Sequence, residues 1–104
     1  MTRGSTTTFI IEPRGIPLID YTKITVVIKQ KKNSSEVEII RTGNNLTIED
    51  DLIYCEALTQ EESRMFDADQ LAEIQLLIRY DDGNVVVSDV VKIDVNRCIY
   101  NHTI

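Results

Sequence analysis

The side chains that could carry out chemistry are few and scattered along this sequence. Cys98 and His102 are spaced closely enough to form a nucleophile and its base. Such a pair needs a third group to orient the histidine and a rigid pocket around it, and the sequence indicates neither. The serines lack the glycine-flanked turn that exposes a nucleophilic hydroxyl. We therefore expect no enzymatic activity, no catalytic or cofactor-binding residue and no small-molecule substrate.

The two cysteines, Cys55 and Cys98, leave a disulfide open as an alternative. A bridge between two sheets is conceivable, but an immunoglobulin-type disulfide packs against a tryptophan, and the chain contains none. We expect Cys55 to fill the core and Cys98 to lie in the C-terminal tail. Two distant cysteines and one histidine are too few for a metal site, which needs three or four ligands.

Acidic residues gather in three short clusters that could supply oxygen ligands. Calcium could bind if two clusters met at one end of the fold, but none has the spacing of a calcium-binding loop, so we expect solvent-exposed turns. The clusters are Glu49, Asp50 and Asp51; Asp67 and Asp69; and Asp81 and Asp82.

The net charge of the chain is −6 at pH 7, from 11 basic and 17 acidic residues. Nucleic acids and anionic membranes bind positively charged surfaces, so neither is expected as a partner. The basic patch of Lys29, Lys31 and Lys32 contains no aromatic residue for base stacking, and we expect it to protect an edge strand from unwanted pairing. No apolar run approaches the roughly 20 residues of a membrane span. The first residues lack the apolar stretch of a signal peptide, so we expect no secretion by that route.

The length of 104 residues predicts one domain spanning residues 1–104. Thr, Ile and Val supply 34 of these residues, whereas Leu and Ala supply only 10. Because β-branched side chains lose rotamer freedom in helices and pack well on a pleated surface, this excess predicts an all-β fold with a core of Ile and Val.

Apolar residues alternate with polar ones in short runs, which are separated by turn signals such as Asp82-Gly83. About seven short strands at this spacing predict an immunoglobulin-like antiparallel β-sandwich. The expected strands cover residues 6–12, 22–30, 36–42, 46–48, 52–58, 71–80 and 85–95.

One short helix is predicted over residues 59–66. Thr59 as N-cap and Glu62 three residues later match a capping box, and acidic residues in the first turn favour the helix dipole. A helix this short is not stable alone, so Met65 and Phe66 are expected to anchor it to the core.

The last predicted strand contains an irregularity. Asp89 shares the parity of Val91 and Ile93, which would place a carboxylate among core side chains at a high free-energy cost. A β-bulge near Ser88 and Asp89 would shift the phase by one residue and remove the conflict.

The strand predicted over residues 52–58 has apolar side chains on both faces. Ile53 and Cys55 would face the core, and Leu52, Tyr54 and Leu58 would face outward. These three side chains could form a protein interface, or they could lie beneath the helical turn over residues 59–66; the sequence leaves both open. An exposed edge strand, such as the N-terminal one, could also add to the sheet of a neighbour.

Four segments of the chain, taken together, form a recognisable pattern: residues 3–9 (Arg-Gly-Ser-Thr-Thr-Thr-Phe), residues 19–26, residues 58–63 together with Phe66, and residues 88–95. This layout resembles small phage and prophage structural proteins of Gram-positive bacteria, and in particular the N-terminal β-sandwich of baseplate upper proteins. The resemblance covers nearly the whole chain. Thr7 stands where such proteins commonly have a proline.

The resemblance implies a non-enzymatic module of a tail or baseplate, held by contacts with other phage structural proteins or with copies of itself. It also implies synthesis in the bacterial cytoplasm and incorporation into the virion. The alternative is a bacterial immunoglobulin-like binding module of the adhesin or carbohydrate-binding type. The missing tryptophan and the small aromatic content, 6% of residues, disfavour sugar stacking and therefore this alternative.

Overall fold

The computed structural model describes residues 1–32 and 34–96 of the chain. The predictions made for Cys98 and His102 lie outside the described residues.

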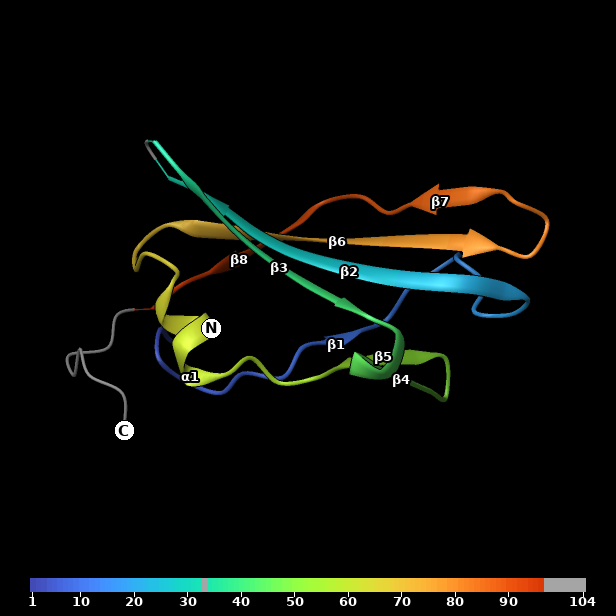
Figure 1. Cartoon of the computed structure of the whole chain (residues 1–104), viewed down its shortest axis with the longest axis horizontal. Coiled ribbons are helices and arrows are strands. Elements are labelled where there is room, and N and C mark those ends of the chain that lie inside the picture. Colours follow the sequence, from blue (N-terminus) through green and yellow to red (C-terminus); the bar gives the residue numbers. More distant parts are fainter. Residues whose placement is uncertain (33, 97–104) are drawn as a thin grey trace.

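Two antiparallel sheets face each other across one hydrophobic core (Figure 1). The large sheet has the order β3-β2-β6, with β7 and β8 following each other along the far side of β6; the small sheet has the order β1-β5-β4. This confirms the predicted all-β antiparallel sandwich. The strands are β1 (Ile10–Ile11), β2 (Tyr21–Lys31), β3 (Glu36–Thr42), β4 (Leu46–Glu49), β5 (Leu52–Cys55), β6 (Leu71–Tyr80), β7 (Val85–Val87) and β8 (Val91–Asp94).

The strand order matches an immunoglobulin sandwich without its first strand. In that fold one sheet has the order A-B-E-D and the other contains C, F and G, with C′ added next to C in some members. Here β1, β5 and β4 take the places of B, E and D, and β3, β2, β6 and the pair β7–β8 take those of C′, C, F and G. Within residues 1–32 and 34–96, no named strand occupies the place of A beside β1.

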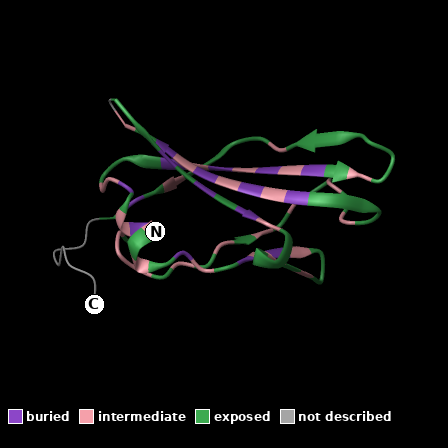
Figure 2. Ribbon diagram, in the orientation of Figure 1, coloured by how far each residue is buried: buried purple, intermediate pink, exposed green. Residues whose placement is uncertain are grey.

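The core faces of β2 and β6 are fixed by strict alternation of side chains, which Figure 2 shows as alternating bands of burial. Because successive residues of a strand point to opposite faces, every second residue reaches the core. The two strands pair over most of their length, with Val26 opposite Leu76. The buried apolar residues of these strands are Ile24, Val26, Ile28, Ala72, Ile74, Leu76 and Ile78.

A single turn of helix, α1 (Gln60–Arg64), closes one end of the sandwich (Figure 1). The predicted capping box is present: the Thr59 hydroxyl accepts from the Glu62 N–H, and the Glu62 carboxylate accepts from the Thr59 N–H. Phe66 is fully buried, as expected of an anchor, but Met65 is 49% exposed and does not share that role.

The predicted bulge in the last strand is confirmed. Val87 lies opposite Leu77 and Val91 lies opposite Ile74, so β7 and β8 carry one more residue than β6 between these pairs. Ser88 fills the break, because its N–H donates to the Leu76 carbonyl and its hydroxyl accepts from the Leu76 N–H. The extra residue turns Asp89 to solvent.

Two predicted strands are shorter than expected. The first, predicted over residues 6–12, is regular only at Ile10–Ile11, because its pairing with β5 slips by one residue nearer the N-terminus: Phe9 O accepts from Cys55 N–H, whereas Thr7 O accepts from Leu58 N–H. The strand predicted over residues 52–58 ends at Cys55.

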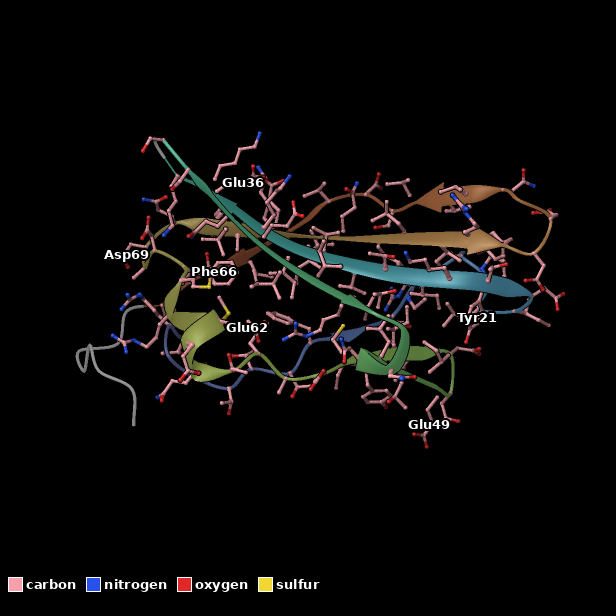
Figure 3. All side chains as sticks on the ribbon, viewed as in Figure 1. Tyr21, Glu36, Glu49, Glu62, Phe66 and Asp69 are labelled. Atoms are coloured by element: carbon pink, nitrogen blue, oxygen red, sulfur yellow. The ribbon has the colours of Figure 1, made fainter. Side chains whose placement is uncertain are left out.

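An ion pair ties α1 to the edge of the large sheet. Arg41 on β3 donates to both carboxylate oxygens of Glu62, at 2.6 and 3.1 Å, and its side chain is only 9% exposed. These hydrogen bonds hold the pKa of the Glu62 carboxyl below its usual range. Figure 3 shows Glu62 pointing from the helix into the space between the sheets.

Glu62→Gln should destabilise the protein by about 1–3 kcal/mol at pH 7, because it removes the charge opposite a nearly buried guanidinium. Glutamine keeps the capping box, so the change isolates the ion pair. Urea unfolding measures the loss, and Glu61→Gln on the exposed side of the same turn is the matched control, expected within about 0.5 kcal/mol of the parent.

The difference between the parent and Glu62→Gln should depend on pH. A carboxyl whose pKa is lowered by folding contributes stability above its unfolded pKa, about 4.3, and loses that contribution as the pH falls through the folded pKa. The difference should therefore be constant between about pH 7 and pH 5 and shrink towards pH 3. A difference that is unchanged at pH 3 would contradict the assignment to the ion pair.

Candidate functional site

The predicted interface residues do not share one surface. Leu58 is 1% exposed and lies in the core, so its predicted outward position is wrong. The reason is that the β5 ladder ends at Cys55, after which the chain no longer alternates between faces. Leu52 and Tyr54 are half-buried and alternate with the buried Ile53 and Cys55, so they lie on the outer face of the small sheet. A protein interface at these two side chains stays a prediction.

A second apolar surface lies at an open edge of the sandwich, where the end of the small sheet meets the end of the large one. We call it the edge groove; its volume is about 290 Å³. Both sheets contribute to it: β1 and its neighbours on one side, β6, β8 and the bulge on the other. Its lining residues are Phe9, Ile10, Ile11, Glu12, Ile74, Leu76, Ser88, Val91 and Ile93.

The exposure of β8 and β7 shows that the core is incompletely covered here. Residues directly opposite in a ladder share a face, so Val91, opposite the buried Ile74, and Val86, opposite the buried Ile78, belong to the core face of the large sheet. Yet Val91 is 59% exposed and Val86 36%. Two core-facing side chains therefore stand in solvent.

The N-terminal segment shapes the groove by pairing with β8 at one end and then leaving it. Thr2 forms a parallel bridge with Asn96. The Arg3 N–H donates to the Asn96 carbonyl, and the Asn96 N–H donates to the Met1 carbonyl. A turn then reverses the chain, and it returns as β1 in the small sheet (Figure 1). The gap between β1 and β8 opens beyond this turn.

Polar contacts with α1 hold the turn in place. The Gly4 N–H donates to the hydroxyl of the fully buried Ser63 at 2.9 Å, and Arg3 Nε donates to the Phe66 carbonyl at 2.9 Å. Gly4 has a φ of +87°, a conformation that other residues adopt only with strain. The point at which the chain changes sheets is therefore fixed, and so is the end of the groove.

The lining of the edge groove suits binding and not proton transfer. Apart from Glu12 and Ser88, the side chains that line it are apolar. The Ser88 hydroxyl is already engaged with the backbone of Leu76 and Asp89. In general, an extended apolar segment can fill a surface of this kind with side chains and pair with an open strand edge.

Two lysines of the predicted basic patch form ion pairs. Lys29 forms ion pairs with Glu36 at 2.6 Å and Glu38 at 3.6 Å, and Lys32 pairs with Asp67 at 3.4 Å. Within residues 1–32 and 34–96, no three or more Asp, Glu, His or Cys side chains lie together where they could hold a metal ion. The carboxylate clusters are thus not assembled into a cation site.

The edge groove was not predicted. A signal in the sequence is the row of valines at positions 85–87, which puts apolar residues on both faces of β7. Such a row is expected where a strand is covered on both sides. In this fold neither face of β7 is covered, because all three valines are exposed.

Comparison with known proteins does not assign the chain to a family. No protein-family model matches it, and no curated protein matches it significantly. Neither of the two helical segments in the described part of the chain is long and apolar enough to cross a membrane.

Cys55 is placed in the core, as predicted, with 3% of its surface exposed. Burial raises the pKa of its thiol to about 11. The thiolate is the reactive form of cysteine, so this group is not a nucleophile at neutral pH.

In a Cys98→Ser background, which leaves Cys55 as the only thiol, the reaction with Ellman's reagent at pH 8 should be at least about 100-fold slower in the native protein than in 8 M urea. Burial and the raised pKa both oppose attack. A native rate within a few-fold of the unfolded rate would contradict the position of Cys55 in the core.

Proposed function

We propose that this chain is a non-enzymatic structural protein of the phage or prophage type, which joins a tail or baseplate through protein–protein contacts at the edge groove. The resemblance of residues 3–9, 19–26, 58–63 with Phe66, and 88–95 to phage structural proteins supports the class. The edge groove supports the mode of action. The proposed location is the virion, after synthesis in the bacterial cytoplasm.

The observation that carries the proposal is the exposure of core-facing side chains along β7 and β8. Burying the exposed half of one Val or Ile side chain contributes about 1 kcal/mol. Ile10, 58% exposed on β1, adds to Val91 on β8, and both side chains line the edge groove. A partner that covers both side chains therefore gains both contributions, which favours association over leaving the edge in water.

The chemistry of the groove defines the partner that fits. Its lining is apolar, so the inserted part of the partner should carry aliphatic side chains. Glu12 at the rim and Asp89 at the bulge are exposed, and the whole chain carries a charge of −6. A neighbouring structural protein that presents an extended aliphatic segment with basic residues beside it matches both features.

The genes that flank this one test the proposed class. They should encode tail or capsid components; if they encode neither, the phage assignment is wrong.

Ile10→Asp and Val91→Asp should each weaken binding to a flanking tail protein at least about tenfold, because each places a carboxylate in the groove. Binding is measured by isothermal titration calorimetry with the purified proteins. Ile19→Asp is the matched control, since Ile19 is 65% exposed and does not line the groove. All three sites are largely exposed, so thermal stability should change little. Equal binding by the parent and both groove variants would exclude the groove as the contact.

A further inference from the structure

Met1–Arg3 form a short parallel pairing with residues 94–96, at the end of β8. Besides the two hydrogen bonds at Asn96, the Met1 ammonium donates to the Asp94 carbonyl at 2.9 Å. These three bonds follow the regular spacing of a parallel pair. Running back from Met1, the path of this ladder leads along β8 and into the edge groove, between β8 and β1.

The outer edge of β8 has backbone groups placed to continue that ladder. The N–H and C=O of one residue in a strand point to the same side, and this side alternates from residue to residue. The Asp94 carbonyl points to Met1 and away from β6. The Asp94 N–H and both backbone groups of Lys92 therefore point to the same open edge. Ile93 and Val91, opposite Ala72 and Ile74, use the other side to pair with β6.

We infer that the edge groove accepts one extended segment of a neighbouring protein as an added strand, which pairs with β8 at the edge of the large sheet. The strand runs parallel to β8 and antiparallel to β1, and it continues the pairing that Met1–Arg3 begin. This inference rests on the proposed function, since it specifies how a partner occupies the groove proposed there.

The register of the added strand follows from the existing bonds. We number the positions of the added strand backwards from Met1. The carbonyl of the residue at position two would accept from the Asp94 N–H, and its N–H would donate to the Lys92 carbonyl. Met1 is half-buried and packs against the core, whereas Thr2 is exposed. By alternation, strand positions two, four and six before Met1 point into the groove, and the odd positions point to solvent. About six residues, roughly 20 Å of strand, reach from Asp94 to the bulge.

The two edges of the large sheet support an added strand on one side only. Along β3, the exposed Glu36 and Glu38 pair with Lys29, and such charges oppose edge-to-edge association. Along β7 the exposed residues are Val85, Val86 and Val87, and along β8 they are Val91, Lys92 and Asp94. The occupant is therefore expected at β8 and not at β3.

A strand fused directly before Met1 tests the inference in the full chain. The first fusion carries six residues with Val or Ile at positions two, four and six before Met1 and Thr at the others. The second has the same composition, but Thr is at positions two, four and six and Val or Ile is at the others, so that its aliphatic side chains would face solvent. A third carries six Gly and Ser residues. All three keep every residue of the protein.

The first fusion should raise the Tm by at least about 5 °C over the second and third. It should also slow hydrogen exchange of the Lys92 and Asp94 amides at least about 100-fold, because these groups become hydrogen-bonded only in the correct register. The amides of Glu36 and Glu38 on the opposite edge should not change. Sedimentation shows whether the strand docks in its own chain or in a second copy.

Equal Tm values and equal exchange in the first and second fusions would overturn the inference. The proposed function fails separately. If the first fusion docks but flanking tail proteins do not bind the parent chain, the inference of an added strand is supported and the proposed phage role is wrong. If those proteins bind the parent and bind the first fusion equally well, the partner does not occupy the strand position, and the inference falls alone.

Discussion

The pairing of β2 with β6 is the constraint on which the rest of this structure depends. Strands of 11 and 10 residues place one continuous aliphatic face against the small sheet. The small sheet must cover that face, yet its strands have only two, four and four residues. Leu58, Phe66 and Val95 fill part of the difference from outside the strands. The small sheet and these added residues end before they reach the core-facing side chains of β7 and β8, and the edge groove is the result.

Polar contacts at one end of the sandwich fix the position at which the N-terminal segment enters the small sheet. Ser63 and the Phe66 carbonyl hold the turn after Thr2, and the Arg41–Glu62 pair holds α1 against β3. The same end contains Gln30, 1% exposed, whose side chain bonds to the backbone N–H and C=O of Asp67. Each of these contacts satisfies a buried polar group, so the end is specified by hydrogen bonds as well as by packing. The stretch of the N-terminal segment that follows this turn forms only a two-residue regular strand.

The sandwich was predictable because its central strands obey a local rule. Alternation over residues 22–30 and 71–80, the capping box at Thr59 and the misplaced parity of Asp89 each depend on neighbours in sequence, and the structure agrees with all three. The outward position predicted for Leu58 was wrong because this residue lies beyond the end of the β5 ladder, where alternation no longer determines which face a side chain is on. Arg41 shares the parity of Val37 and Ile39, but its partner Glu62 lies on another element. The edge groove depends on how far one sheet extends over the other; the valines at positions 85–87 indicate apolar faces there, but they do not encode the extent of the small sheet.

An open sheet edge lined with valines is a liability in a protein that acts alone, because it invites uncontrolled pairing. The charged residues along β3 show that this chain does protect an edge of the same sheet. The two edges thus differ in composition although they belong to one sheet, and the one with exposed valines borders the edge groove at Val91. Under the proposed function this difference has a physical reason, because an edge that must pair cannot also be protected. The β3 edge then repels further strands, and the β8 edge accepts a single strand in a fixed register.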